Sequence, residues 1–312
     1  MASLFIWFQY LVPQHLLSRL VGWLANSRRL RVPFIRWFVK RYRVDLSEAT
    51  VQEYGDFASF NDFFTRELKP EARPLAEQAG AVLCPADGCI SQLGTINDAL
   101  MLQAKGRYFS VDELLGVSTN ADMSGLYHGD VATMQLNRVA EAQHGTDVAA
   151  LYRNGSFATI YLAPRDYHRV HLPLAGRLLR TRYIPGKLFS VNKVTTERVP
   201  NLFARNERLV CEFITDSGPM ALIMVGAMIV AGIETVWGGR AMPGKFRVDD
   251  YQQTSPPIEL ARGAEVGRFL LGSTVIVLFP HGSVKLNSEL TADCPVLMGQ
   301  QMGQQMEQQP GQ

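Results

Sequence analysis

Residues 267–280 have the sequence GRFLLGSTVIVLFP, in which a Gly-Ser-Thr tripeptide separates two apolar runs. The second run, Val275 to Phe279, is rich in β-branched and aromatic residues and predicts a buried strand. Gly272 allows a backbone conformation that a side chain would block, so the Gly272-Ser273 step is predicted to be a tight turn entering that strand. Ser273 places a hydroxyl beside the carbonyl of Gly272. If a base removes the hydroxyl proton, the oxygen can attack the preceding peptide bond, and the chain would cut itself.

Taken alone, the tripeptide is ordinary turn chemistry. Two other stretches give it a second interpretation: one contains Asp87, followed by Gly88, and the other contains His168 and His171. Asp, His and Ser side chains together allow a base-activated nucleophile. Each also has a plain alternative, because Asp-Gly is a common turn pair and the two histidines could be core or surface residues linked to Asp166.

The motifs, in this order, resemble the phosphatidylserine decarboxylase family, close to its bacterial membrane-associated members. The resemblance rests on Leu271 to Thr274, Pro85 to Gly88 and Asp166 to His171, and it extends from near the N-terminus to about Leu286. The supporting stretches are Phe60 to Arg66, Gln103 to Gly106, Leu188 to Asn192 and Asn201 to Arg208.

The resemblance implies a pyruvoyl-dependent carboxy-lyase made as a zymogen. Attack of Ser273 on the Gly272 carbonyl would give an ester, and elimination, tautomerisation and hydrolysis would leave a pyruvoyl group at position 273 and release ammonia. The products would be chains 1–272 and 273–312, which stay associated. The pyruvoyl group would replace pyridoxal phosphate as the electron sink, form a Schiff base with phosphatidylserine and yield phosphatidylethanolamine, with no metal.

Residue roles follow from the resemblance and from side-chain chemistry. His171 is the candidate base for Ser273, and Asp87 is expected to hold the imidazole in the correct tautomer. His168 is the candidate proton donor in the decarboxylation. Tyr161 and Ser190 are weaker candidates for the substrate pocket.

Beyond Val82, short apolar runs separated by Gly, Pro and Asn predict a mainly antiparallel β sandwich or barrel-like core, placed in a catalytic domain at 76–298. With helices in residues 1–75, including a short one from near Ser59 to Pro70, the predicted class is α+β. Residues 117–147, which contain His128 and His144, depart from the family and are predicted to be an inserted loop. The tail, 299–312, is rich in Gln, Gly and Met and is predicted to be disordered.

Charge and aromatic residues are concentrated near the N-terminus. Residues 1–44 contain eight Lys or Arg, no Asp or Glu, and three tryptophans, Trp7, Trp23 and Trp37. The apolar run from Leu4 stops at Pro13, well short of the roughly 20 residues that span a bilayer, and no signal peptide is evident. We expect helices lying in the interface of an anionic membrane, peripheral to the cytoplasmic face of a bacterial inner membrane. The alternative is that these helices simply pack on the core.

Other classes fit less well. The four cysteines, at positions 84, 89, 211 and 294, lack metal-like spacing and predict buried apolar residues. A lipid-directed serine hydrolase could use Asp87, His171 and Ser273, but the Gly-x-Ser-x-Gly elbow of such enzymes is missing. A non-enzymatic membrane-binding protein would leave these residues unexplained. A homodimer is expected, and nucleic acid is not expected as a partner.

Overall fold

The computed structural model describes residues 7, 9–10, 12–117, 148–228, 232–241, 244–270 and 273–307. The apolar run identified above forms strand β15, Ser273–Phe279, and every residue of this strand is buried. It lies between β5, Ser156–Leu162, and β9, Gly218–Gly226, and pairs antiparallel with both. A strand with neighbours at both edges and side chains covered on both faces has no solvated positions, so its sequence is apolar almost throughout.

In the part of the chain that the structure describes, the strands form four sheets, all paired antiparallel. The largest has the order β12-β7-β8-β9-β15-β5-β2-β17, with β13 beside β7, and the others have the orders β11-β10-β14-β6, β1-β18-β16 and β3-β4. None of these sheets closes into a barrel within the described ranges, so the predicted α+β class is confirmed as open antiparallel sheets. The other strands are β1 Ala81–Leu83, β2 Gly88–Thr95, β3 Leu100–Ala104, β4 Arg107–Ser110, β6 Arg169–His171, β7 Gly176–Ile184, β8 Arg208–Thr215, β10 Ile233–Thr235, β11 Gly239–Ala241, β12 Arg247–Asp250, β13 Glu259–Leu260, β14 Glu265–Phe269, β16 Val284–Leu286, β17 Pro295–Val296 and β18 Gln301–Gln305.

The core has two apolar layers, one on each face of the large sheet. Successive side chains of a strand point to opposite faces. Val275 and Val277 of β15 enter a cluster shared with the smaller sheets, whereas Ile276 and Leu278 enter a second cluster. That second cluster is covered by short helices, namely α5 Val111–Leu115, η3 Val148–Tyr152, α7 Lys193–Arg198 and α8 Leu202–Arg205.

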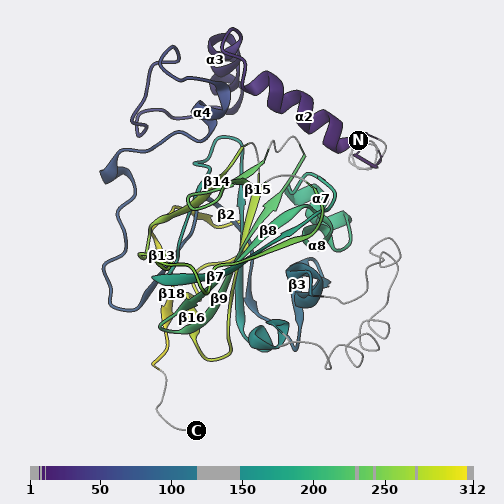
Figure 1. Cartoon of the computed structure of the whole chain (residues 1–312), viewed down its shortest axis with the longest axis vertical. Coiled ribbons are helices and arrows are strands. Elements are labelled where there is room, and N and C mark those ends of the chain that lie inside the picture. Colours follow the sequence, from purple (N-terminus) through teal and green to yellow (C-terminus); the bar gives the residue numbers. More distant parts are fainter. Residues whose placement is uncertain are drawn as a thin grey trace.

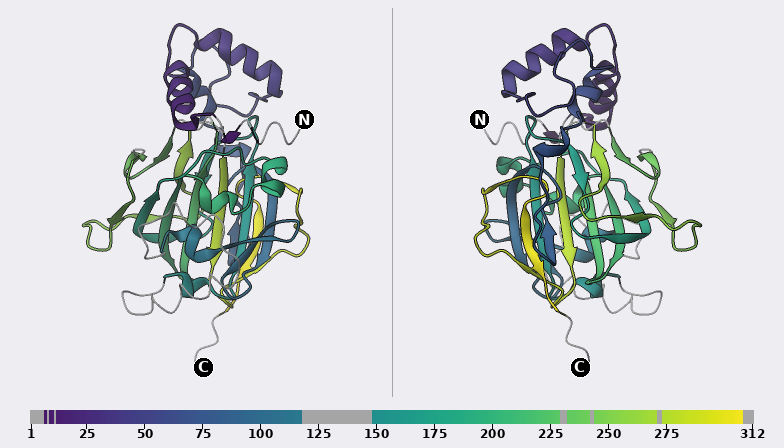
Figure 2. Two further views of the ribbon diagram at one scale, coloured as in Figure 1. Left: turned by 90° about the vertical axis from the view of Figure 1, so that its right-hand side faces the viewer. Right: turned by 90° about the vertical axis from the view of Figure 1, so that its left-hand side faces the viewer.

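The N-terminal helices α2, Gln14–Ala25, and α3, Arg31–Tyr42, sit at one end of the sheets together with α4, Phe60–Phe64 (Figure 1). The side views show the same helical layer above the strand ends (Figure 2). Aromatic rings of α3 and α4 form a third apolar cluster among these helices and the segment at 44–57. No helix in the described part of the chain is long and apolar enough to cross a membrane.

Helix α4 begins where the sequence predicts and ends earlier. The Ser59 hydroxyl caps it by accepting a hydrogen bond from the Asp62 N–H at 3.1 Å. The helix stops at Phe64 rather than near Pro70, because residues 66–69 are extended and hydrogen bond to residues 48–50. A single 3-10 turn, η1 Pro70–Ala72, follows.

The prediction of a disordered tail from residue 299 is wrong for its first part. Gln301–Gln305 form β18, which pairs with β1 on one side and β16 on the other. A Gln-rich segment can join a sheet because its backbone groups supply the ladder, and Met302 supplies a buried side chain. Residues 308–312 and the predicted insertion at 118–147, with His128 and His144, lie outside the described residues.

Candidate active site

Ser273 opens β15 and is completely buried. It pairs with Leu162 of β5 and with Gly226 of β9, so its side chain points to the face of the large sheet that carries Val275. That face is covered by the smaller sheet containing β6 and β14. The Ser273 hydroxyl has no hydrogen-bond partner, which is costly for a buried polar group and is a common sign of a functional role. Its predecessor in the chain, Gly272, lies outside the described residues.

His168 is buried between α4 and the turn that follows β5. Its Nδ1 lies 2.8 Å from the carbonyl oxygen of Asp166, and its ring centroid lies 4.0 Å from that of Phe64. Because a carbonyl only accepts, Nδ1 carries the proton and Nε2 has a lone pair, which has no hydrogen-bond partner. Burial lowers the pKa of His168 to about 3, so the imidazole is neutral at pH 7.

His171 lies three residues further on, in β6, and both of its ring nitrogens are engaged. Nδ1 donates to the carbonyl oxygen of Gly263 at 2.8 Å, and Nε2 lies 3.0 Å from the hydroxyl of Tyr167. Burial lowers the pKa of His171 and raises that of Tyr167, so a neutral imidazole accepts from a protonated phenol. Gly263 therefore fixes the tautomer in which Nε2 can act as a base.

Asp87 has different partners from the one that the sequence suggested. Its carboxylate receives Nε and Nη2 of Arg73, at 2.8 and 2.5 Å, and the backbone N–H of Met298 at 2.9 Å. The other terminal nitrogen of the same guanidinium lies 2.9 Å from a carboxylate oxygen of Glu48. The expected Asp87–His171 hydrogen bond is not formed in this structure, although the charge of Asp87 acts to raise the pKa of His171 against the larger effect of burial.

Tyr161 and Ser190 lie apart from the Ser273 hydroxyl. Tyr161 pairs with Thr274, so its side chain is on the opposite face of the large sheet, against the second apolar cluster. The backbone N–H of Ser190 donates to the side-chain oxygen of Gln9 at 2.8 Å, which ties this loop to the N-terminal segment.

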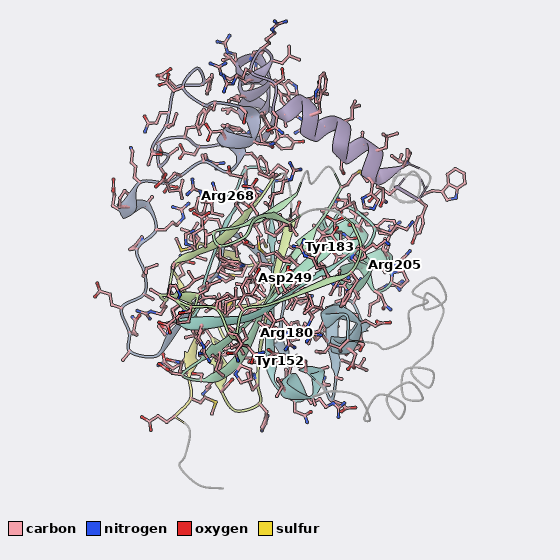
Figure 3. All side chains as sticks on the ribbon, in the orientation of Figure 1. Tyr152, Arg180, Tyr183, Arg205, Asp249 and Arg268 are labelled. Carbon is pink, nitrogen blue, oxygen red and sulfur yellow. The ribbon has the colours of Figure 1, made fainter. Side chains whose placement is uncertain are left out.

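Three residues at this end of the sheets were not singled out from the sequence: Arg66, Arg73 and Tyr167. Arg66 and Tyr167 do lie within motifs noted above. The hydrogen bonds of Arg66 join segments about 100 residues apart, and that of Tyr167 depends on the local backbone turn, and neither can be read from the sequence. Figure 3 shows Arg268, which pairs with Arg169 across β14 and β6, at the same end of the molecule as the N-terminal helices.

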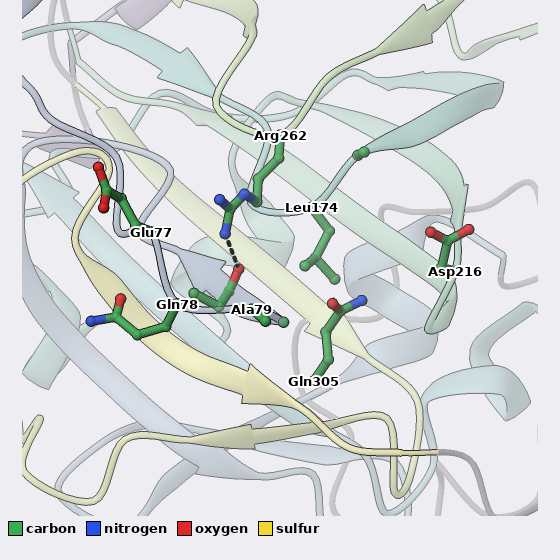
Figure 4. Close-up of a pocket in the computed structure, with 10 residues that line it drawn as sticks. Glu77, Gln78, Ala79, Leu174, Asp216, Arg262 and Gln305 are labelled. Atoms are coloured by element: carbon green, nitrogen blue, oxygen red, sulfur yellow. Dashed lines mark hydrogen bonds between the residues drawn. The ribbon is translucent and has the colours of Figure 1, made fainter.

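A separate pocket of about 220 Å³ lies elsewhere. It is lined by residues that include Glu77, Asp216 and Arg262, whose guanidinium donates to the carbonyl oxygen of Ala81 at 3.1 Å (Figure 4). Asp216 precedes β9, whereas Ser273 pairs with the last residue of β9, so about 25 Å of strand separates the pocket from Ser273. Among the described residues, no group of three or more His, Cys, Asp or Glu side chains is placed to hold a metal ion.

Comparison with known proteins adds the family context. The profile described as phosphatidylserine decarboxylase matches residues 60–304, and a profile described as PSD matches residues 4–43. The chain is 52% identical over 305 residues to the phosphatidylserine decarboxylase proenzyme of Ectopseudomonas mendocina strain ymp, covering 96% of this chain and 97% of that protein. It is 52% identical over 304 residues to the proenzyme of the same name from Pseudomonas aeruginosa strain PAO1, covering 95% of each.

Proposed function

The chain belongs to the phosphatidylserine decarboxylase family, and we propose that it matures by cutting its own backbone between Gly272 and Ser273. The mature enzyme then decarboxylates phosphatidylserine to phosphatidylethanolamine. The observation that carries the proposal is the completely buried Ser273 hydroxyl, which has no partner and opens the central strand.

In the cut, the Ser273 hydroxyl gives up its proton and its oxygen attacks the Gly272 carbonyl, replacing the amide by an ester. Elimination then breaks the ester bond, leaving a carboxylate on Gly272 and dehydroalanine at 273. Tautomerisation and addition of water release ammonia and leave a ketone, the pyruvoyl group. We assign the base to His171, whose Nδ1–H is held by Gly263 so that Nε2 can accept a proton. Tyr167 has to release Nε2 before this step.

The pyruvoyl carbonyl supplies the electron sink for loss of CO₂. Residues at this end of the sheets fit such a group, because the buried Ser273 oxygen from which it would form has no competing partner. His168 is assigned the proton transfer of the decarboxylation. Its Nε2 accepts the proton that the substrate ammonium group loses on becoming nucleophilic, and the same atom delivers that proton to the carbon that has lost CO₂. His168 is neutral before substrate binding, so the Nε2 lone pair is available to accept it.

Membrane attachment through α2 and α3 is part of the proposal. Trp23 is 71% exposed and Trp37 is 53% exposed, and Leu16, Leu20 and Leu30 are exposed as well. Exposed large apolar side chains in a segment that also carries many basic residues suit the interface of an anionic bilayer. The protein would then be peripheral to the membrane, with the substrate headgroup entering beneath the helices. The homodimer expected from the family stays a prediction.

The intact mass of the purified protein tests the proposal. We expect two polypeptides, 1–272 and a fragment beginning at position 273 whose N-terminus is blocked to Edman sequencing. Borohydride added with phosphatidylserine should couple the lipid amine to the smaller fragment and abolish CO₂ release. A serine hydrolase would instead remain a single chain and be labelled at Ser273 by a fluorophosphonate, and an intact, active 312-residue chain would refute the pyruvoyl mechanism.

A further inference from the structure

Arg66 follows α4 and is only 5% exposed. Its Nη2 donates to the carbonyl oxygens of Arg165 and Asp166, at 3.0 and 3.3 Å. Its Nε and Nη1 are buried and have no hydrogen-bond partner. A guanidinium remains charged in proteins, so two unmet N–H donors at a buried positive charge carry a large cost in free energy. Such an arrangement is expected where another molecule supplies the missing acceptors.

The carboxylates near Arg66 are already engaged. Both oxygens of Asp87 are bound by Arg73, and one of them also accepts the Met298 N–H. One oxygen of Asp166 accepts the Ala163 N–H at 2.7 Å. Arg73, close enough to repel Arg66, adds to the positive potential. The free donors of Arg66 therefore suit an incoming anion rather than a side chain of this protein.

Arg66 also adjoins the proposed catalytic histidine. The Asp166 carbonyl oxygen accepts from Arg66 Nη2 and from His168 Nδ1, so one backbone atom positions both side chains. Arg66 comes directly after α4, which packs against α3 under the exposed tryptophans. The third apolar cluster reaches His168 through the ring of Phe64, and Arg66 follows Phe64 by two residues. An anion held by Arg66 would lie between the membrane-facing helices and the reacting carbon.

We propose that Arg66 binds the phosphodiester of the phosphatidylserine headgroup, and this inference rests on the decarboxylase activity proposed above. The phosphodiester links the glycerol to the serine, so it occupies the intermediate position that Arg66 offers. The substrate carboxylate is a poorer occupant, because an ion pair with the leaving group would stabilise the ground state and slow its loss as CO₂. A planar guanidinium with two free donors matches two phosphate oxygens.

The test compares phosphatidylserine with O-dodecylserine, which keeps the free amine and carboxylate but lacks the phosphate. Wild type, Arg66→Gln and Arg66→Lys are assayed in mixed micelles for CO₂ release, after self-cleavage is checked on a gel. Arg66→Gln should raise KM for phosphatidylserine about 10- to 100-fold, since charge-assisted hydrogen bonds are lost. In Arg66→Gln, the ratio of kcat/KM for phosphatidylserine to that for O-dodecylserine should fall by a similar factor. The ratio for Arg66→Lys should lie between those of wild type and Arg66→Gln.

The matched control is Arg165→Gln, which removes an exposed charge from the neighbouring turn and should leave the substrate ratio within twofold of wild type. Equal losses on both substrates in Arg66→Gln would assign the carboxylate to Arg66 and overturn the proposal. No loss on either substrate in Arg66→Gln would overturn it too.

Free phosphate provides a measurement that does not depend on a variant. Inorganic phosphate should inhibit the wild type competitively against phosphatidylserine, beyond the effect of chloride at equal ionic strength. Inhibition no greater than that by chloride would overturn the inference. If the wild type neither cuts itself nor releases CO₂, the proposed function fails instead, and the two failures are thereby distinguished.

Discussion

Replacing Ser273 by alanine should abolish maturation and at the same time stabilise the fold. Alanine cannot attack the Gly272 carbonyl, so the chain should remain whole and inactive. The Ser273 hydroxyl is completely buried without a partner, and leaving a hydroxyl unsatisfied costs about 1–3 kcal/mol. Removal of a single oxygen leaves little empty space, so we expect a gain of about 1–2 kcal/mol. For a chain of this length, this corresponds to a rise in Tm of about 1.5–3 °C.

The comparison needs two chains that are both uncut. We would therefore measure thermal unfolding of His171→Ala and of the double variant His171→Ala/Ser273→Ala, with the uncut state verified by mass spectrometry. Ser110→Ala is the matched control, because Ser110 is also buried but its hydroxyl caps α5 by accepting from Asp112 N–H. That change should lower the free energy of unfolding by about 1 kcal/mol. A double variant less stable than His171→Ala would refute the reasoning, since Ser273 would then have a stabilising partner.

Three further outcomes are expected. His168→Ala should cut itself but release CO₂ poorly, whereas His171→Ala should stay a single chain; equal loss of cutting in both would refute this division of roles. The double variant Trp23→Ser/Trp37→Ser should bind phosphatidylserine vesicles about tenfold more weakly or worse in a sedimentation assay, whereas the control Tyr108→Ser, which changes an exposed side chain of β4, should bind normally. Added salt should weaken wild-type binding. The pKa of His168 is lower in the folded protein than in the unfolded chain, so the unfolded chain takes up this proton more readily. Its contribution to stability is therefore complete above about pH 6.5 and declines as pH falls towards 3, by up to about 1.4 kcal/mol per unit, and urea titrations of His168→Ala should show a shallower decline.

Features that depend on neighbouring residues in the sequence could be predicted well. The run from Val275 to Phe279 was expected to be a strand because no polar residue interrupts it, and it forms most of β15. Ser59 was expected near a helix start and caps α4. In each case the physical cause acts over a few residues.

Features that depend on distant contacts could not be predicted. Arg73 holds Asp87, and Gly263 holds His171 through a backbone carbonyl that any residue type would provide. The face of the sheet on which Tyr161 lies follows from its pairing with Thr274. This strand register cannot be read from the sequence. Strand β18 forms because two partners already offer unpaired edges, although its own composition argues for a mobile tail.

The position of β15 has a consequence for the life of the molecule after the cut. This strand lies between β9 and β5, and β16, β17 and β18 from the same C-terminal segment are paired with other strands. The cut would turn strand pairs within one polypeptide into an interface between two polypeptides. The uncut precursor would refold in a first-order reaction. After the cut, two polypeptides would have to meet, so refolding would be second-order and would slow with dilution. The mature protein would thus be assembled once, and its lifetime would be governed by the rate of unfolding rather than by an equilibrium.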